Sequence, residues 1–299
     1  MKRVLIVGSG DVAERALPWL VKRFRVFALV RDPERAKAVR ALGARAIGGD
    51  LDNRSSLHRL AGIADLVLHF APPPANGAKD LRTAALVAAL ATRRSLPQRF
   101  VYISTTGVYG DCAGAWVDET RPCRATTVRA RRRVDAEHRL RRLNRSGGPS
   151  VSILRAPGIY AADRLPVARL ERGDPVLLAQ EDVYTNHIHA DDLARLACLA
   201  LFRGRPCRVY NAVDASDMKM ADYFDLAADM FGMARPRRVT RLELEGELSS
   251  MALSFMSESR RLRGERVLRE FRVALRYPTV NEGLAAARAL RQQGDFTRC

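Results

Sequence analysis

The sequence is poor in lysine, in aromatic residues and in long apolar runs. Only five of its 51 basic residues are lysines, and aromatic residues make up 6% of the chain. No apolar run approaches the roughly 20 residues that a membrane-spanning helix needs. Residues 1–10 have a short apolar core followed at once by glycines, whereas a secretory signal has a longer apolar stretch and a cleavage site. We therefore expect a buried strand at the start of the chain and no membrane partner.

Cysteine is present but shows no pattern. The number of cysteines is odd, and no two of them form a CxxC pair. They are Cys112, Cys123, Cys198, Cys207 and Cys299. A disulfide framework or a zinc site needs paired or regularly spaced cysteines, so the sequence predicts neither, and we expect no bound metal. A reducing, cytoplasmic location fits this usage.

The chain carries a formal net charge of +18, supplied mostly by arginine. A basic surface attracts phosphate, so a nucleic-acid partner is one interpretation. The other is a generally arginine-rich surface, because the arginines are spread along the chain with one concentration at 129–145. No nucleic-acid-binding module is recognisable and aromatic residues are scarce. Nucleic acid is therefore not the favoured partner, although the 129–145 cluster could contact it or another acidic partner.

Short apolar runs alternate with helix-like segments through the first half of the chain. The runs are continuous in apolar character, which indicates strands buried on both faces. Strands are predicted at 3–7, 25–30, 44–50, 64–71, 99–104 and 150–156. Helices are predicted at 12–22, 33–43, 54–62, 79–93 and 128–143. This repetition predicts an α/β fold, a Rossmann-type doubly wound parallel sheet with helices on both faces.

The first predicted strand runs directly into a glycine turn. Gly8 permits the tight turn, Gly10 lets a pyrophosphate approach the backbone, and Ala13 allows close packing of strand and helix. Phosphate would then bind the free amides at the helix N-terminus. The alternative is an ordinary glycine-rich turn, but the position between a strand and a helix favours a nicotinamide cofactor. The predicted cofactor-binding residues of this turn are Gly8, Ser9, Gly10, Asp11 and Val12.

The ends of the next strands predict which cofactor binds. Arg31 follows the second strand directly, and an arginine there pairs with the 2′-phosphate of NADP, whereas an acid there binds the ribose of NAD. Asp32 can simply cap the next helix. We therefore expect NADP, with NAD as the alternative. The loops after the third and fourth strands would border adenine and ribose through Asp50, Leu51, Ala71 and Pro72.

The second half of the chain is less regular. It predicts a short helix at 165–173, a helix at 189–204, a strand at 207–213 and a helix at 220–232, then a mixed segment to residue 299. No linker or repeat separates these parts. We predict an NAD(P)-binding domain at 1–155 that also takes in about 182–214. A smaller substrate-binding part, interleaved with it, would comprise 156–299, mainly 156–181 and 215–299.

Six segments occur in the order typical of one family. They are GSGDVA (8–13), GGDLDN (48–53), YISTTGVYG (102–110), ILRAPGIYA (153–161), NHIHADDLA (186–194) and VYNAVD (209–214). The chain thus resembles the extended and atypical short-chain dehydrogenase/reductases, the NAD-dependent epimerase/dehydratase group. LRYPTVNEGL (275–284) is similar to the tail of the atypical members. The resemblance implies a Rossmann fold with a small C-terminal substrate domain, a small-molecule substrate, and a homodimer formed through helices 79–93 and 128–143.

The chemistry implied by the resemblance uses a serine or threonine, a tyrosine and a lysine. Thr105 occupies the first position and would orient a substrate oxygen, although the neighbouring Ser104 and Thr106 leave the registration open by one residue. In the family, the tyrosine exchanges a proton with the substrate. The lysine lies four residues later, lowers the tyrosine pKa and holds the cofactor ribose.

This chain lacks both the tyrosine and the lysine. Glu137 fits the glutamate that commonly follows the lysine by four residues, which puts Arg133 at the lysine position and Arg129 at the tyrosine position. No tyrosine occurs between Tyr109 and Tyr160. Arginine keeps its proton up to about pH 12, so it donates hydrogen bonds but does not exchange protons near neutrality.

Several roles remain open for these residues. Arg133 could bind the ribose, and Arg129 could hold an anionic substrate group through two hydrogen bonds, or both could be solvated. Tyr109 is the candidate for a surrogate acid. The catalytic candidates are Thr105, Tyr109, Arg129 and Arg133. Two functions follow: an NADP-dependent oxidoreductase or epimerase-like enzyme with a non-standard proton donor, or a non-catalytic NADP-binding sensor of redox state or metabolites.

Overall fold

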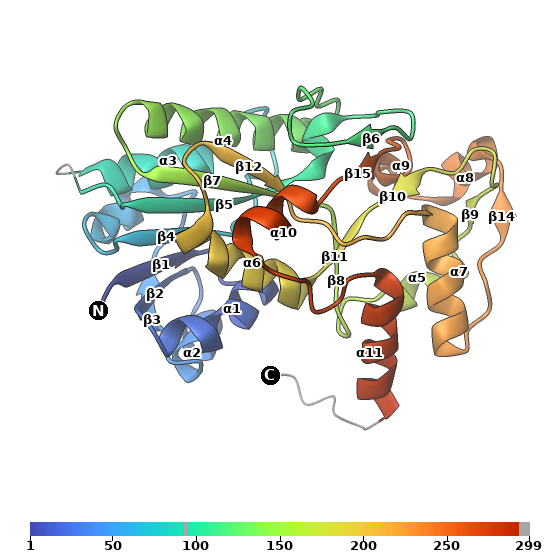
Figure 1. Ribbon diagram of the computed structural model, residues 1–299, viewed down its shortest axis with the longest axis horizontal. Helices are drawn as coiled ribbons and strands as arrows, with labels where there is room; N and C mark the ends of the chain where they lie inside the picture. The colour runs from blue at the N-terminus through green and yellow to red at the C-terminus, as the bar shows by residue number, and fades with distance from the viewer. Residues whose placement is uncertain (93–94, 293–299) are drawn as a thin grey trace.

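The computed structural model describes residues 1–92 and 95–292 and is built around one parallel sheet (Figure 1). Its seven strands lie in the order β12-β7-β5-β4-β1-β2-β3. Their bounds are β1 Arg3–Val7, β2 Arg25–Val30, β3 Arg45–Gly48, β4 Leu66–His69, β5 Arg99–Thr105, β7 Ser150–Ala156 and β12 Arg208–Asn211. All neighbouring pairs are parallel. The order reverses between β1 and β4, where open α/β sheets bind their ligands.

Helices cover both faces of this sheet. Side chains alternate along each strand, so Val4 and Ile6 pack on one face while Leu5 and Val7 pack on the other. The first face is covered by α1 Asp11–Val21, α2 Pro33–Ala41, α6 Ala190–Arg203 and α10 Glu265–Phe271. The second is covered by the 3-10 helix η1 Arg54–Leu60, α3 Leu81–Ala91 and α4 Val128–Arg145. The predicted Rossmann-type α/β fold is confirmed.

The remaining elements form a smaller lobe at the carboxyl edge of the sheet (Figure 1). Its strands pair as β6 Trp116–Val117 with β15 Arg261–Leu262, β8 Gly158–Tyr160 with β11 His187–His189, β9 Val176–Leu177 with β14 Arg238–Val239, and β10 Tyr184–Thr185 with β13 Met218–Lys219. Its helices are the 3-10 helix η3 Thr106–Tyr109, α5 Val167–Glu171, α7 Met220–Phe231, α8 Arg241–Glu247, α9 Ser250–Phe255 and α11 Val280–Gln292. A separate core joins α7 to α11 through Phe224 and Leu284.

Most of the predicted helices and strands are present, and one predicted helix is of a different kind. The segment predicted as a helix at 54–62 is the 3-10 helix η1. Ser55 and Ser56 donate hydrogen bonds to Asn53, and Ser56 also donates to the carbonyl oxygen of Asp50. These local bonds compete with regular helical bonding and explain the tighter turn. Residue 93, the predicted end of another helix, and Cys299 lie outside the described residues.

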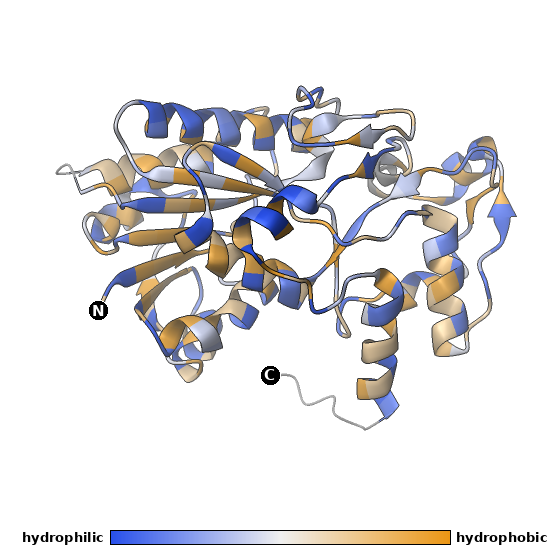
Figure 2. Cartoon of the chain, in the orientation of Figure 1, coloured by the Kyte–Doolittle hydropathy of each residue, from blue (hydrophilic) through white to orange (hydrophobic). Residues whose placement is uncertain are grey.

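The hydropathy of the residues follows the same layering. Figure 2 shows hydrophobic residues along the strands and many hydrophilic residues along α4. α3 and α4 are neighbours, and the homodimer expected through them stays a prediction, as do the domain boundaries. Among residues 1–92 and 95–292, no helix is both long and apolar enough to cross a membrane.

Candidate functional site

Two cavities lie at the carboxyl edge of the sheet, on either side of the loop after β4. The small cavity has a volume of about 320 Å³ and is lined by residues from the loops after β1, β2, β3 and β4, including Gly8, Gly10 and Arg31. The large cavity has a volume of about 620 Å³ and lies between β5, α4 and the smaller lobe. Pro72 lines both cavities, so the two are adjacent.

The glycine turn has the geometry that a phosphate needs. Gly8 has φ +93°, and a Cβ atom there would lie 2.3 Å from the backbone nitrogen of Ala71, so only glycine fits. Gly10 is the N-cap of α1, has no side-chain cap, and a Cβ there would meet nothing within 4 Å. The first amides of α1 therefore face open space, which suits the pyrophosphate of a dinucleotide.

The structure brings most predicted cofactor residues together. The small cavity is lined by Gly8, Ser9, Gly10, Arg31, Asp50, Leu51, Ala71 and Pro72. Val12 lines the large cavity instead. Asp11 lines neither cavity, and its carboxylate pairs with Arg15 at 2.7 Å and Arg164 at 3.1 Å. The predicted role of Asp11 was that of its backbone amide in the first turn of α1, and this role stays a prediction.

Arginines surround the outer end of the small cavity. Arg31 is exposed, and its side chain makes no hydrogen bond or ion pair within the part of the chain that the structure describes. Asp32 instead accepts the backbone N–H of Arg35 at 2.8 Å and caps α2, which was the alternative for this residue. Its carboxylate is therefore already engaged.

Two further arginines of the small cavity escaped the sequence analysis. Arg35 pairs with Glu14 of α1. Arg82 of α3 holds Asp52 through two hydrogen bonds of 2.8 and 2.5 Å, which lowers the pKa of that carboxyl. Arg82 lies about 50 residues beyond Arg31 in the chain, so no local motif could have joined them.

Thr105 lies at the end of β5 and lines the large cavity. Its hydroxyl oxygen accepts the backbone N–H of Gly107 at 3.3 Å, which leaves the hydroxyl proton for a ligand. Ser104 is buried and donates to Glu137 at 2.6 Å. Thr106 also lines the cavity. Of the three hydroxyl groups considered for binding a substrate oxygen, that of Ser104 therefore already donates its proton within the protein.

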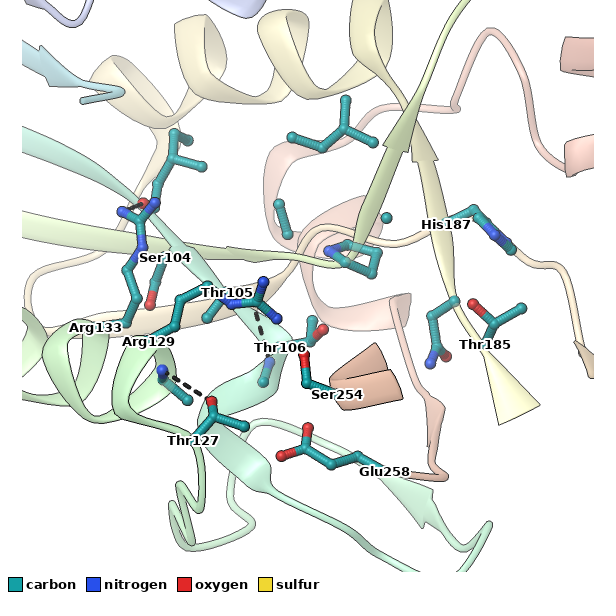
Figure 3. A pocket seen from close by; sticks show the side chains of 18 of the residues that line it. Ser104, Thr105, Thr106, Thr127, Arg129, Arg133, Thr185, His187, Ser254 and Glu258 are labelled. Atoms are coloured by element: carbon teal, nitrogen blue, oxygen red, sulfur yellow. Dashed lines mark hydrogen bonds between the residues drawn. The ribbon is translucent and has the colours of Figure 1, made fainter. Parts of the chain in front are cut away.

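Arg129 and Arg133 extend from α4 into the large cavity (Figure 3). Arg133 donates to the carbonyl oxygen of Ile103 at 2.8 Å and to the hydroxyl of Tyr102 at 2.9 Å. Arg129 lies at the rim, and partial desolvation lowers its pKa; Glu258 raises it, and the like charges of Arg133 and Arg132 lower it further. The two positions thus hold cations that donate hydrogen bonds.

Tyr109 is not at the cavity. Its side chain is fully buried, its hydroxyl donates to Asn211 at 2.7 Å, and the guanidinium of Arg155 lies 4.7 Å from its ring centre. Burial raises the pKa of Tyr109 to about 12. A buried phenol that donates to an asparagine cannot reach a ligand in the large cavity, so we correct the expectation that Tyr109 serves as a surrogate acid.

Beneath these residues lies a buried ion pair. Arg155 of β7 holds Glu137 of α4 through hydrogen bonds of 3.0 and 2.6 Å, and both side chains are 2% exposed. Ser104 donates to the same carboxylate. The pair fastens α4 to the strands one turn after Arg133, and so it positions the arginines that line the cavity.

The lobe supplies walls that the sequence analysis did not identify. From α7 come Met220, Tyr223 and Phe224, and from the segment after α8 come Ser254, Glu258 and Arg260. Glu258 accepts hydrogen bonds from Thr126 and Arg260, each at 2.8 Å. His187 also lines the cavity; it is buried, and desolvation lowers its pKa to about 3, which keeps the ring neutral. Residues 215–260 carry no recognisable motif, so no sequence signal pointed to them.

Comparison with known proteins gives a family and a fold. The model of a protein family described as NAD(P)H-binding matches residues 8–202. A curated relative, the 4-hydroxy-2-methyl-3-oxo-4-farnesyl-3,4-dihydroquinoline-1-oxide ketoreductase of Stigmatella aurantiaca, is 35% identical over 132 residues. That match covers 41% of this chain and 39% of the relative, so it spans well under half of either protein.

Solved structures resemble the whole chain. A functionally unknown conserved protein from Silicibacter pomeroyi DSS has a TM-score of 0.81 and 29% identity, and the match covers 98% of this chain and 100% of that one. A double mutant of the dTDP-glucose 4,6-dehydratase of Streptomyces venezuelae, with NAD bound, has a TM-score of 0.77, 21% identity, and coverage of 99% and 98%. The UDP-glucuronic acid 4-epimerase of Bacillus cereus, also with NAD, has a TM-score of 0.76, 18% identity, and coverage of 97% and 99%. The last two similarities establish the fold.

Proposed function

The chain belongs to the NAD(P)H-binding family, and on that basis we propose that it is an NADP-dependent oxidoreductase or epimerase-like enzyme that works without the usual tyrosine and lysine. NADP, when bound, supplies or accepts the hydride. The observation that carries the proposal is the small cavity, where the uncapped N-terminus of α1 lies near the unpaired side chain of Arg31. The amides suit the pyrophosphate, and Arg31 suits the 2′-phosphate.

The protein's own groups then bind and orient the reactants. Thr105 donates its hydroxyl proton to a substrate oxygen, and Arg133, fixed by Ile103 and Tyr102, directs its remaining N–H groups towards the ribose. Arg129 stabilises negative charge on the substrate. Neither arginine exchanges protons near neutral pH, so the proton comes from water in the cavity. Orientation and electrostatic stabilisation thus supply the rate enhancement.

A second function has its own supporting observation. Arginine stands at both positions of the proton-transfer pair, and Tyr109 is turned away into the core. A protein that keeps the nucleotide site but has, at these two positions, groups that hold their protons near neutral pH suits a non-catalytic sensor that reports NADP or a metabolite by binding it. Both functions require the same nucleotide site.

Titration with NADPH and NADH tests the nucleotide site. Arg31→Ala should weaken NADPH binding at least about tenfold, because a charge-assisted hydrogen bond to phosphate is lost, and should leave NADH binding unchanged. The matched control is Arg40→Ala, an exposed arginine in the last turn of α2, which should alter neither affinity. If wild-type protein binds neither nucleotide, both proposed functions fail. Equal losses for NADPH and NADH in Arg31→Ala would contradict the phosphate role.

Turnover separates the two functions. With NADPH bound, a panel of carbonyl compounds is screened for transfer of deuterium from the cofactor to product. Transfer to any compound identifies an enzyme. Tight NADPH binding without transfer to any member, combined with a ligand-dependent change in NADPH affinity, identifies the sensor.

A further inference from the structure

We propose that the large cavity binds an organic acid, with its carboxylate at Arg129 and an apolar body against α7. This inference rests on the proposed function, because it names the substrate class of the same site. It begins from the unusual charge of the cavity and from the position of that charge beside Thr105.

The cavity has a large excess of positive charge. Arg129, Arg132 and Arg133 reach it from two successive turns of α4, and Arg169 and Arg260 reach it from the lobe. Among the described residues that line it, Glu258 is the only carboxylate. A concave site lined by charge of one sign concentrates ligands of the opposite sign. The lining therefore selects for anions.

Arg169 pairs with Asp174 at 3.3 Å and Arg260 with Glu258 at 2.8 Å, so the excess positive charge comes from α4. There, hydrogen bonds hold Arg132 and Arg133 in place without neutralising them. Arg132 donates to the carbonyl oxygens of Ala75 and Gly77 at 2.7 and 3.0 Å, and its buried Nε has no partner among the described residues. Arg133 likewise donates to uncharged oxygens. A carbonyl or phenol oxygen orients a guanidinium but leaves its full charge, so the cationic side of the cavity is pre-organised for a negative group.

Glu258 does not cancel this charge. Its two oxygens accept hydrogen bonds from Thr126 and Arg260. In Figure 3, Arg129 extends from α4 towards Thr105 and Ser254, while Glu258 lies farther along the cavity, beyond Ser254. One carboxylate thus faces several guanidinium groups, and like charges on α4 destabilise one another until an anion binds.

The rest of the cavity argues for an acid with an apolar body. Phe70, Met220, Tyr223 and Phe224 line it together with a run of prolines. His187 lines it too, and its ring is buried and neutral. One anionic end, one apolar end and a polar atom near Thr105 describe an aryl or alkyl keto or hydroxy acid.

The position of the cation decides where the carboxylate lies. The resemblance places a neutral phenol at residue 129, whereas this chain has a guanidinium there, which lines the same cavity as Thr105 and extends towards it in Figure 3. A carboxylate bound bidentately to Arg129 is therefore adjacent to the oxygen that Thr105 binds. The acid group and the reacting carbon of the substrate are neighbours.

The test uses phenylpyruvate, its neutral methyl ester and inorganic phosphate as probes, titrated calorimetrically into the full chain with and without NADP⁺. Phenylpyruvate should bind at least about tenfold more tightly than its ester, because the ester loses a charge-assisted bidentate contact. It should also bind more tightly than phosphate, which lacks the apolar body. Failure of phenylpyruvate to bind, or equal binding of acid and ester, overturns the proposal.

A pair of variants locates the contact. Arg129→Gln should weaken phenylpyruvate at least about tenfold while leaving NADP⁺ affinity unchanged. Arg131→Gln removes the same charge from the neighbouring exposed position outside the cavity and should have no effect. Equal losses in both variants would show general attraction to a basic surface and overturn the proposal. Wild-type protein that binds phenylpyruvate but not NADP⁺ would retain this inference and refute the proposed function.

Discussion

The two cavities recognise charge in different ways. In the small cavity the groups that suit a pyrophosphate are backbone amides at Gly10. Of the neighbouring arginines, Arg35 and Arg82 are paired with carboxylates, whereas Arg31 has no such partner among the described residues. In the large cavity the recognising groups are the side chains of Arg129, Arg132 and Arg133. Among the described residues that line this cavity, Glu258 supplies the one carboxylate. The first site depends on chain geometry and the second on which residues occupy a few positions. The cofactor site can therefore persist while the chemistry beside it changes.

The largest expected effect concerns the support beneath the large cavity. Glu137→Gln should destabilise the fold by about 3–5 kcal/mol, because it leaves the Arg155 guanidinium buried without a charged partner. Chemical denaturation measures the change. As a control, Asp229→Asn breaks the exposed pair with Arg235 and should leave stability unchanged within error. A small loss in Glu137→Gln would mean that α4 is held by packing alone.

A pair of glycine substitutions should separate geometry from recognition in the small cavity. Gly8→Ala should cost about 2–3 kcal/mol of stability, because the new Cβ meets Ala71 in a backbone conformation unfavourable to alanine. Gly10→Ala has room for its Cβ and should keep stability, yet lose NADPH affinity because the methyl group occupies the space of the pyrophosphate. Thermal unfolding and NADPH titration on both variants check this. Loss of stability in both would contradict the distinction.

A buried carboxyl group, that of Asp214, lies beside His187 of the large cavity, because the backbone N–H of Asp214 donates to the carbonyl oxygen of His187. Asp214 is buried, and desolvation raises its pKa to about 7. The native state thus keeps a proton that the unfolded chain releases above about pH 4, so stability should fall as pH rises from about 4 to 7.

Asp214→Asn should remove this decline. The gain in unfolding free energy of the variant over the wild type should therefore be about 1–3 kcal/mol larger at pH 8 than at pH 5. The asparagine oxygen can still accept the N–H of Ser216, as the carboxylate does. Unfolding free energies of both proteins across this pH range provide the measurement. Parallel pH profiles would show that Asp214 is ionised in the native state.

The smallest effect comes from restoring the family pattern. In the double substitution Arg129→Tyr with Arg133→Lys, the cationic surroundings should lower the pKa of the introduced phenol by about one unit from its usual value near 10. Ultraviolet difference titration against Arg129→Phe with Arg133→Lys isolates that phenol. An unshifted pKa would show that the position is too exposed for the family's proton chemistry.

The sequence predicted the sheet and the small cavity well, for a physical reason. Buried parallel strands require continuous apolar runs, and the turn at Gly8 requires glycine, so both leave local patterns. η1 differed because hydrogen bonds from Ser55 and Ser56 overrode the helix pattern. Whether the predicted residues serve the roles assigned to them stays a prediction, except that Tyr109 lies in the core.

The walls of the large cavity left no comparable pattern. Glu258 meets Thr126 across 132 residues of chain, and α7 contributes apolar residues that look like ordinary core. Such contacts depend on how the lobe folds back over the sheet, and a single sequence does not encode that at fixed spacings. The sequence predicted that the family's tyrosine is missing, whereas it did not predict the cavity into which Arg129 and Arg133 extend.

Pro72 links the two cavities. It lines both of them, and Arg132 ties the same loop to α4 through the carbonyl oxygens of Ala75 and Gly77. Ligands bound in the two cavities would therefore contact one shared loop. Where both ligands favour the same position of that loop, each should raise the affinity for the other by the same factor. The shared loop would then make the binding of the two ligands cooperative.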